Sequence, residues 1–552
     1  MEETTDVNTV VPPIKKMRLP PKIDLTLSTL EDGTQVSTLD RICKDVQAPA
    51  TERPTDKQFW LSSDHDKPNL PFLRDHFHRQ GRLEEEQALW IIRTGTDILR
   101  CEDTLLTVKA PMTICGDIFG QYYDLMKILE VGGDPYETPY LFLGNYVNHG
   151  RFGIECILYL WSLKISYPQT FWLLRGNHEC RHMTDSFTFK AECIHKYSKD
   201  VYEACMESFD CLPSAAVINE KLLCLHGGLS PELQTLDQLR EIDRFCEIPT
   251  SGLMCDILWS DPMEAYGQET IADSFIPNEK RGISYSFAYQ AVCEFLERNN
   301  LLSIIRGHEP QEQGYRLYRK PENAVFSSLM AVFSAPNYKD LYKNRAAMIK
   351  YENNAIDIKH FDCSPHPFCL PNSMDAFTWS LPFVAEKIVD MLLAILIICS
   401  RRREVDWKGD RKEGREEDLL LSAPVSAPIG YSANDPDSVE FKRRAIKYKT
   451  LAVARMSRAF SVLRQESEAV SSFKVPVGDR LSADTLVVGG EAPKDTVQTF
   501  EDAQKLDLVN ERLPPSHQQI LFNMEQEKME ALYRACEATS EDSQLGRRIA
   551  WC

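Results

Sequence analysis

Several apolar runs of this 552-residue chain end in a residue that can bind a metal ion or move a proton. Asp117, Asn177, His226 and His308 each stand shortly beyond such a run. Taken singly, each is a weak signal, because a histidine after an apolar run is usually a capping or packing residue. Together, carboxylate, amide and imidazole groups at the strand ends of one α/β pattern predict a metal-assisted phosphoester site.

The first elements that would position these residues form a strand–helix–strand unit. The apolar runs Met112–Cys115 and Tyr140–Gly144 flank a helical pattern over Gln121–Val131, which Gly132 and Gly133 close. This is the repeating unit of an α/β sheet, and such sheets place their chemistry at the C-terminal ends of their strands.

Helices and strands alternate onward from this unit to Lys350, and a helical pattern over Asn69–Glu102 precedes it. Five further apolar runs read as strands, the second and third of them paired in a hairpin around Asn219-Glu220: Phe171–Leu174, Ala215–Ile218, Lys221–Leu225, Leu302–Ile305 and Met330–Phe333.

Composition narrows the class of protein. A chain of this length predicts one large domain with extensions. The net charge of −19 argues against nucleic-acid binding. No signal-peptide pattern opens the chain, and its longest apolar stretch, Met391–Cys399, is far shorter than the roughly 20 residues of a membrane span. Seventeen cysteines without a CxxC pair suit reduced thiols in a cytoplasmic protein.

The order of the motifs resembles a known family. GDIFG, GNYVNHG, RGNHE, HGG and RGHE are similar to motifs of the phosphoprotein phosphatase family of Ser/Thr protein phosphatases. RGNHECRH, FDCLPSAAV, MCDILWSDP, FSAPNY and FTWSLPFV resemble its calcineurin catalytic (A) subunits, from about Ser37 to about Ser516. The resemblance implies an α/β fold of the metallophosphoesterase type. This is a β-sandwich flanked by helices, with two metal ions (iron and zinc, or manganese) at the strand ends.

The resemblance also implies a ligand set for each ion. The first ion would be held at the positions of Asp117, Phe119 and Asn145. The second would be held by a set that shares one residue with the first: Asn145, Asn177, His226 and His308.

Four residues correspond to the family's other catalytic positions. His178 matches the general acid, and Asn148 stands where the family has that acid's aspartate partner. Arg281 matches one phosphate-binding arginine, whereas His149 replaces the other.

Departures from the family pattern fall on chemical positions and predict impaired catalysis. Phe119 has no lone pair for a metal. Asn145 replaces an aspartate that bridges both ions, and two divalent ions about 3.7 Å apart repel by about 18 kcal/mol at an effective dielectric of about 20. A neutral amide offsets little of this, so at most one ion, zinc or manganese, is expected. Asn148 removes the anion that keeps His178 protonated, and His149 cannot grip phosphate as arginine does.

For two of these residues a simpler interpretation stands beside the functional one. Phe119 would be an apolar side chain that fills the space of an empty metal site. His149 would be a solvated or locally bonded histidine.

A long helical pattern follows the catalytic region. Residues 375–400 carry a broad apolar stripe, which is either an ordinary core helix or a helix seated in a partner's groove. The resemblance implies the second, with the EF-hand B subunit of calcineurin as partner. The stripe comprises Val384, Ile388, Met391, Leu392 and Ile395.

Residues 441–465 combine basic and apolar side chains at helical spacing, which suits calmodulin or an anionic membrane surface. The resemblance favours calmodulin, with four residues as anchors: Arg455, Met456, Phe460 and Leu463. Residues 498–516 resemble the family's autoinhibitory segment, in which Glu511 would face the metals; otherwise they form a short surface helix.

The predicted organisation follows from these assignments. It consists of a disordered arm (1–70), a phosphatase-like domain (71–370), the B-subunit helix (371–400), linkers (401–440 and 466–497) around the calmodulin segment, the autoinhibitory segment, and a tail (517–552). Substrate docking in the family implies an edge strand and a groove, at these positions: Asp357, Ile358, Lys359, Trp379 and Phe383.

Two classes of function remain open. One is a pseudophosphatase that assembles with a B subunit and calmodulin and binds phosphoprotein partners. The other is a calcium/calmodulin-dependent phosphatase that hydrolyses phosphoserine and phosphothreonine slowly with one metal. The ligand chemistry favours the first.

Overall fold

The computed structural model describes residues 49–270, 272–322, 325–367 and 499–515. It also describes residues 27–29 and 35–37 and single positions between 377 and 392.

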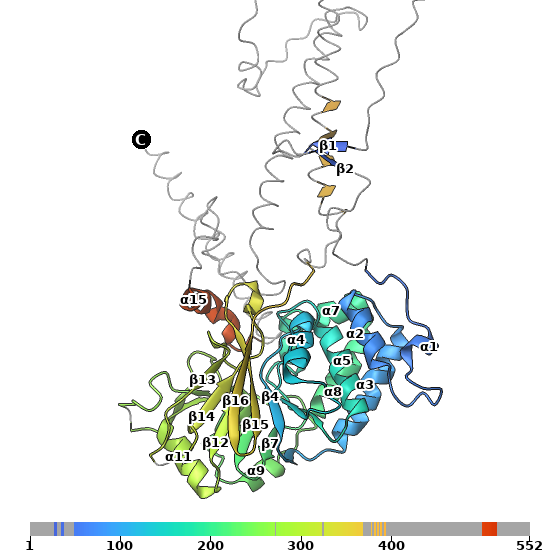
Figure 1. Ribbon diagram of the computed structural model, residues 1–552. Helices are drawn as coiled ribbons and strands as arrows, with labels where there is room; N and C mark the ends of the chain where they lie inside the picture. The colour runs from blue at the N-terminus through green and yellow to red at the C-terminus, as the bar shows by residue number, and fades with distance from the viewer. Residues whose placement is uncertain are drawn as a thin grey trace, which may run out of the picture.

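Two mixed β-sheets form the centre of the domain (Figure 1). The six-stranded sheet has the order β13 (Tyr315–Leu317), β14 (Leu329–Val332), β12 (Ser303–Arg306), β8 (Leu222–Leu225), β7 (Ala215–Ile218) and β3 (Leu105–Val108). The five-stranded sheet has the order β16 (Ala355–Phe361), β15 (Ala346–Glu352), β4 (Met112–Cys115), β5 (Tyr140–Phe142) and β6 (Phe171–Leu173). Apolar side chains from both sheets, including Ile114, Leu141 and Ile305, share one buried core.

Helices cover the outer faces of both sheets (Figure 1). One group shares a buried apolar core with the five-stranded sheet: α1 (Asp56–Phe59), α2 (Leu70–His78), α3 (Glu85–Arg100), α4 (Tyr122–Gly132), α5 (Gly153–Ser166), α7 (Phe189–Lys196) and α8 (Lys199–Asp210). Another packs on the six-stranded sheet: α6 (Arg181–Ser186), α9 (Leu236–Arg240), α10 (Leu253–Trp259) and α11 (Tyr289–Arg298). The predicted β-sandwich flanked by helices is therefore confirmed.

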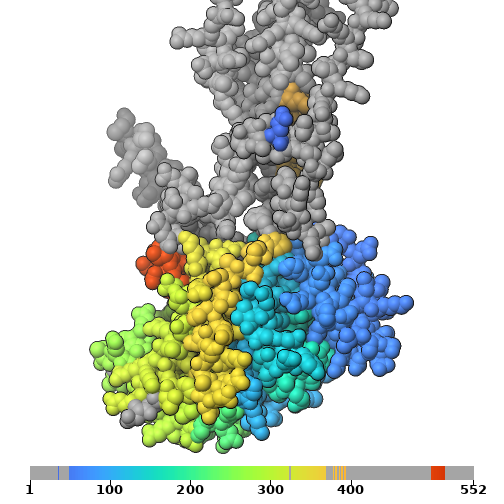
Figure 2. Space-filling model, viewed as in Figure 1, coloured from blue at the N-terminus to red at the C-terminus, as the bar shows by residue number. Residues whose placement is uncertain are grey.

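Smaller elements complete the described part of the chain. β1 (Leu27–Thr29) pairs with β2 (Gln35–Ser37), and a three-stranded sheet has the order β10 (Phe275–Pro277), β11 (Tyr285–Phe287), β9 (Asp261–Pro262). A short 3₁₀ helix, η1 (Tyr338–Asp340), follows β14. Far along the chain, α15 (Phe500–Glu511) lies against the domain surface (red in Figure 2).

The elements that were predicted to position the site are present. β4, α4 and β5 form the expected strand–helix–strand unit, with β4 and β5 parallel. Gly133 ends α4 with φ 110°, a backbone conformation that favours glycine. β7 and β8 form the predicted hairpin. Three residues, 219–221, separate the paired Ile218 and Leu222, and Asn219 and Glu220 both have positive φ.

The predicted disordered arm extends too far along the chain. Residues 56–59 form α1 inside that range, and Phe59 is completely buried in the core beside the helices. Pro54 is held there because its carbonyl accepts a hydrogen bond from Gln87 of α3. The stretch 1–70 has few apolar residues, so its pattern did not predict that Phe59 is buried.

Asp124 on α4 makes the stability of the domain depend on pH. Burial raises the pKa of Asp124 to about 6, although Ser364 N and Gln121 Nε2 donate hydrogen bonds to its carboxylate. The unfolded chain has a lower value of about 3.9, so the folded state binds more protons between these values. Stability therefore falls as pH rises through this window, by roughly 2–3 kcal/mol in total.

Replacing Asp124 with asparagine should remove that loss. We expect Asp124→Asn to be more stable than the wild type at pH 7.5, by up to roughly 2 kcal/mol, with the gain fading toward pH 4.5. Denaturant unfolding at both pH values measures it. Asp97→Asn, on an exposed aspartate of α3, should change neither value. An Asp124→Asn variant less stable than wild type at pH 7.5 would contradict the prediction.

Candidate active site

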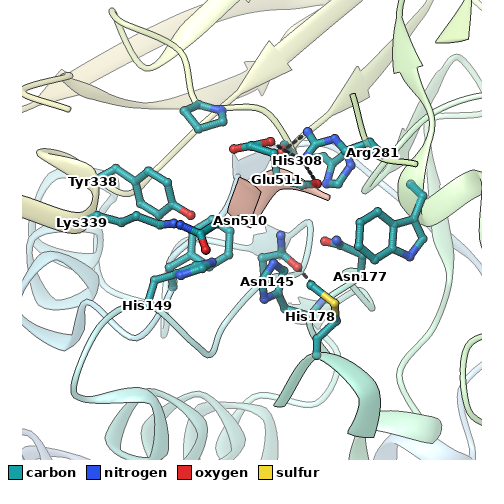
Figure 3. Close-up of a pocket in the computed structure, with 14 residues that line it drawn as sticks. Asn145, His149, Asn177, His178, Arg281, His308, Tyr338, Lys339, Asn510 and Glu511 are labelled. Atoms are coloured by element: carbon teal, nitrogen blue, oxygen red, sulfur yellow. Dashed lines mark hydrogen bonds and ion pairs between the residues drawn. The ribbon is translucent and has the colours of Figure 1, made fainter. Parts of the chain in front are cut away.

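The strand ends of both sheets meet at one edge of the sandwich. β4, β5 and β6 run parallel, so the residues that follow them, Asp117, Asn145 and Asn177, come to the same side. β8 and β12 are also parallel and deliver His226 and His308 there. A hydrogen bond of 3.0 Å from the His308 backbone N–H to Asp117 Oδ1 joins the two groups. The structure thus brings together the residues that the sequence predicts, and Figure 3 shows Asn145, Asn177 and His308 among them.

Three of these side chains bring polar atoms together around His226 Nε2. His226 Nε2 lies 2.9 Å from Asn177 Oδ1 and 3.2 Å from His308 Nδ1. His226 Nδ1 lies 3.0 Å from the carbonyl oxygen of Leu143, which can only accept, so the ring proton sits on Nδ1 and Nε2 is a lone pair.

The imidazoles of this cluster stay neutral. Burial lowers the pKa of His226 to about 3 and takes that of His308 well below its usual range. A lone pair that faces an amide oxygen, with no proton to share, suits a bound cation. Asn177, His226 and His308 therefore fit one metal ion.

The neighbouring position does not fit a second ion. Asn145 Nδ2 donates to Asp117 Oδ2 at 2.9 Å, while Asn145 Oδ1 accepts from the backbone N–H of His178 at 3.0 Å. The amide thus turns its nitrogen toward the carboxylate and its oxygen away. Asn145, predicted to lend an oxygen to the second ion, does not join the cluster. Within the described ranges no three His, Cys, Asp or Glu side chains gather as a metal site, so the remaining cluster relies on an asparagine.

Phe119 fills the space beside Asp117. Its side chain is 4% exposed, and its ring centroid lies 5.0 Å from that of His149, 5.1 Å from His178 and 4.9 Å from Tyr338. The backbone at Phe119 has φ 49°, which an aromatic residue rarely adopts. The turn therefore keeps a conformation that does not suit the residue it now carries. Ring packing of this kind agrees with the simpler interpretation of Phe119.

His149 also packs rather than binds. Besides Phe119, its ring contacts those of Phe187 (centroids 4.8 Å apart) and Tyr338 (5.7 Å), and its side chain is buried. A buried imidazole among aromatic rings is a poor substitute for a guanidinium.

His178 is held in a neutral form. Asn148 Oδ1 accepts from the backbone N–H of Phe189 at 3.1 Å, which fixes the amide so that Nδ2 faces His178 Nδ1 at 2.9 Å. Because that amide nitrogen donates, His178 Nδ1 must accept, and the ring proton lies on Nε2. Burial is the main cause that lowers the pKa of His178 well below its usual range, and the neighbouring His149 lowers it further. His178 can donate a hydrogen bond to a ligand but lacks the extra proton of an imidazolium acid.

Arg281 is the pocket's main anion-binding group. It is 4% exposed, its Nε donates to Asp261 Oδ2 at 2.8 Å, and it also contacts the carboxylate of Glu511. Lys280 Nζ lies 3.7 Å from Glu511 Oε2 and 3.6 Å from Glu309 Oε1. Asp261 and Lys280 were missed in the sequence, although both lie in or next to motifs that carry the family resemblance.

The pocket is covered by α15, at the place of the predicted autoinhibitory segment. Asp507 accepts from Lys339 Nζ at 2.7 Å and from Tyr342 Oη at 2.8 Å, and Ala503 is fully buried. Glu511 lines the pocket, and its carboxylate pairs with Arg281 (Figure 3). It also pairs with Lys280, whereas the resemblance implies that it would face metal ions. Burial would raise the pKa of Glu511, yet these two cations bring it below its usual range.

Regulatory positions are only partly described. Val384, Ile388, Met391 and Leu392 have helical backbone and are 43–56% exposed, while Ile395, Trp379 and Phe383 lie outside the described residues. So does the whole calmodulin segment with its anchors: Arg455, Met456, Phe460 and Leu463. The predicted docking strand is β16, which among the described strands pairs only with β15 and so forms an edge of that sheet. Asp357, Ile358 and Lys359 lie on it.

Comparisons with known proteins agree with the motifs. Residues 110–312 match the family model of calcineurin-like phosphoesterases. The chain is 47% identical over 536 residues to serine/threonine-protein phosphatase 2B catalytic subunit A1 of Saccharomyces cerevisiae, covering 95% of this chain and 96% of that one. It is also 47% identical to subunit A2 of that yeast over 528 residues, or 89% and 87% of the two chains.

Among solved structures, a yeast protein serine/threonine phosphatase with similarity to human phosphatase PP5 is 31% identical. It aligns with a TM-score of 0.49, covering 54% of this chain and 96% of that one. No helix in the described part of the chain is long and apolar enough to cross a membrane.

Proposed function

Because the chain belongs to the family of protein phosphatase 2B (calcineurin) catalytic subunits, we propose that it is a catalytically impaired member that binds phosphoprotein partners. The observation that carries this proposal is the hydrogen bond from Asn145 Nδ2 to Asp117 Oδ2. An amide donor occupies the side of the carboxylate that a bridging ligand would share with two cations. The first ion thereby loses its bridging ligand at Asn145. It also loses a second ligand at Phe119, which has no atom that binds a metal.

The residues of the second position still suit one cation of the kind that the family uses. Asn177, His226 and His308 would hold zinc or manganese, and such an ion would polarise a phosphoryl oxygen when bound. All three donors are neutral, which favours a weakly held ion.

The remaining side chains of the pocket suit binding better than hydrolysis. Arg281 and Lys280 offer positive charge to a phosphate, and His178 offers a neutral N–H. General acid catalysis needs a group that gives up a proton near neutral pH, and His178 in its neutral form does not supply one.

A slow phosphatase that uses one metal is the alternative, and the cluster of lone pairs around His226 favours it. The two functions differ in turnover. A binding protein retains the phosphate of a bound phosphopeptide, whereas a slow enzyme releases it in proportion to metal occupancy.

Regulation is proposed from the family and from the segments outside the catalytic domain. The exposed apolar positions between 384 and 392 suit an EF-hand regulatory subunit. Residues 441–465 suit calmodulin, and the described part of the autoinhibitory segment, residues 499–515, covers the pocket until that complex forms. The cytoplasm, where calcium signals reach such a complex, is the proposed location.

The test is to measure binding and turnover on the same sample. The chain is purified with its regulatory subunit and given a fluorescent phosphoserine peptide with calcium, calmodulin and manganese. We expect saturable binding without phosphate release above the buffer rate. Release that rises with manganese, at the rate of a family enzyme measured in parallel, would contradict the proposal.

Removal of a single ligand should empty the metal position. We expect His226→Ala to lose the bound zinc or manganese of the wild type, measured by elemental analysis after dialysis. His149→Ala removes a histidine of the same pocket that lies outside the cluster, so it should keep the metal. Equal metal content in the two variants would contradict the assignment.

A further inference from the structure

The chain does not leave the domain where α15 ends. At Arg512 it turns to an extended conformation (φ −81°, ψ 151°) and continues along the surface to Pro515. The Leu513 backbone N–H donates to the carbonyl oxygen of Arg281 at 2.9 Å. His182 Nε2 lies 2.7 Å from the carbonyl oxygen of Pro514, so it donates its proton there. Residues 511–515 therefore lie on a strip of surface beside the pocket, here named the groove, that is formed by Arg281, His182 and the apolar cluster under Leu513.

The residue at the head of this groove is an anion. The carboxylate of Glu511 contacts Arg281, which is 4% exposed, and lies 3.7 Å from Lys280 Nζ. A guanidinium and an ammonium that converge on one anion also suit the dianionic phosphate of a phosphoserine or phosphothreonine. Glu511 thus stands where a phosphorylated side chain of another peptide would lie.

Leu513, two positions after Glu511, provides an apolar contact. Leu513 packs against the buried cluster that contains Met183 and Trp259, and both of these also line the pocket. Arg512, between the two, is exposed. The backbone contacts made by Arg281 and His182 do not depend on the peptide's side chains. Selection by sequence therefore rests on the anion and on the residue two positions after it.

From these contacts we infer that the pocket and its groove recognise a phosphorylated peptide in the register of residues 511–515. The phosphorylated residue lies at Arg281 and Lys280, any residue follows, and an apolar residue such as leucine comes next. This inference rests on the proposed binding function, which it makes specific for sequence. It also makes α15 and its extension a competitor that uses the same contacts.

The experiment uses the full chain with its regulatory subunit, in EDTA so that no peptide is hydrolysed. The probe is a labelled hexapeptide with the sequence of residues 510–515 and phosphoserine in place of Glu511. The pocket is opened by Asp507→Lys, which sets a lysine against Lys339. Glu501→Lys makes the same charge change at an exposed position of α15 and serves as its control.

Two peptide variants test the register, with binding measured by fluorescence anisotropy. We expect glutamine in place of the leucine to weaken binding to the opened chain by about tenfold, the value of a partly buried leucine. Glutamine in place of the arginine should leave binding unchanged. A further variant changes the protein instead of the peptide. Leu513→Gln in the otherwise wild-type full chain should raise the affinity for the parent phosphopeptide by a similar factor, because it weakens the binding of the chain's own residues 511–515 to the groove. This variant tests the groove without depending on Asp507→Lys.

The outcomes separate this inference from the proposed function. If both glutamine peptides bind as tightly as the parent, the register is wrong while phosphopeptide binding stands. If no phosphopeptide binds the opened chain, the binding function itself fails and takes the inference with it. If the unphosphorylated serine peptide binds as well as the phosphopeptide, the assignment of Arg281 and Lys280 to phosphate is overturned.

Discussion

Reverting four side chains together is expected to convert this protein into an active phosphatase. The changes are Phe119→His, Asn145→Asp, Asn148→Asp and His149→Arg. They restore the residues that the family resemblance implies at these positions: a metal ligand, the bridging carboxylate, the partner of the general acid and a phosphate-binding guanidinium. We expect manganese-dependent release of phosphate from a phosphoserine peptide to rise by about 10³-fold or more, since general acid catalysis and a bridged metal pair each contribute on that scale.

The scaffold around these positions supports recovery. Arg281, Arg306 and Asp261 already form a buried ion-pair network beside His308. Phe119, Asn145, Asn148 and His149 all have positive φ, so the turns hold a conformation independent of the side chains that they now carry. The double variant Phe119→His with His149→Arg, which lacks both aspartates, is the matched control and should stay inactive. A quadruple variant that binds two metal ions yet stays inactive would show that the impairment lies elsewhere.

The single change Asn145→Asp should by contrast destabilise the protein when no metal is present. It replaces the amide that donates to Asp117 at 2.9 Å with a second carboxylate, in a site where both residues are almost completely buried. Two buried carboxylates in contact cost about 3 kcal/mol, because an attractive hydrogen bond becomes a repulsion between like charges. Denaturant unfolding in EDTA measures this, and added manganese should recover part of the loss.

Asn148→Asp makes the same chemical change beside a histidine. Asn148 Nδ2 lies 2.9 Å from His178 Nδ1, and that ring can shift its proton to Nδ1 and donate it to the new carboxylate. We therefore expect little loss of stability from Asn148→Asp. Equal destabilisation by both substitutions would mean that the Asp117–Asn145 contact has no special role. A more stable Asn145→Asp in EDTA would contradict the repulsion directly.

The positions of the site residues could be predicted because they depend on strand ends. Asp117, Asn177, His226 and His308 each follow a short apolar run, and the parallel order of those strands brings them together. Runs of this kind are visible in a sequence because a buried strand must be apolar on both faces. The fold and most element boundaries were therefore accessible without coordinates.

What could not be predicted depends on orientation. Whether Asn145 turns its oxygen or its nitrogen toward Asp117 is decided by the backbone N–H of His178, which claims the oxygen. In the same way, the N–H of Phe189 decides which end of Asn148 meets His178. Asparagine offers a donor and an acceptor of equal size, so the residue type alone leaves both arrangements open.

Long-range partners were also hidden. Glu511 was expected to face metal ions. Instead it pairs with Lys280 and with Arg281, which precedes it in the chain by 230 positions. Lys339 and Asp507 form a buried ion pair that no sequence motif predicts. Such pairs depend on where α15 docks, which the local pattern of an amphipathic helix does not specify.

We propose that this pocket holds one cation and not two. The most direct measurement is a crystal structure of the protein soaked in manganese, with anomalous scattering used to locate the metal. We predict one peak, among Asn177, His226 and His308, with Asn145 still bonded to Asp117. Two well-occupied peaks, one of them against Asp117, would contradict the account.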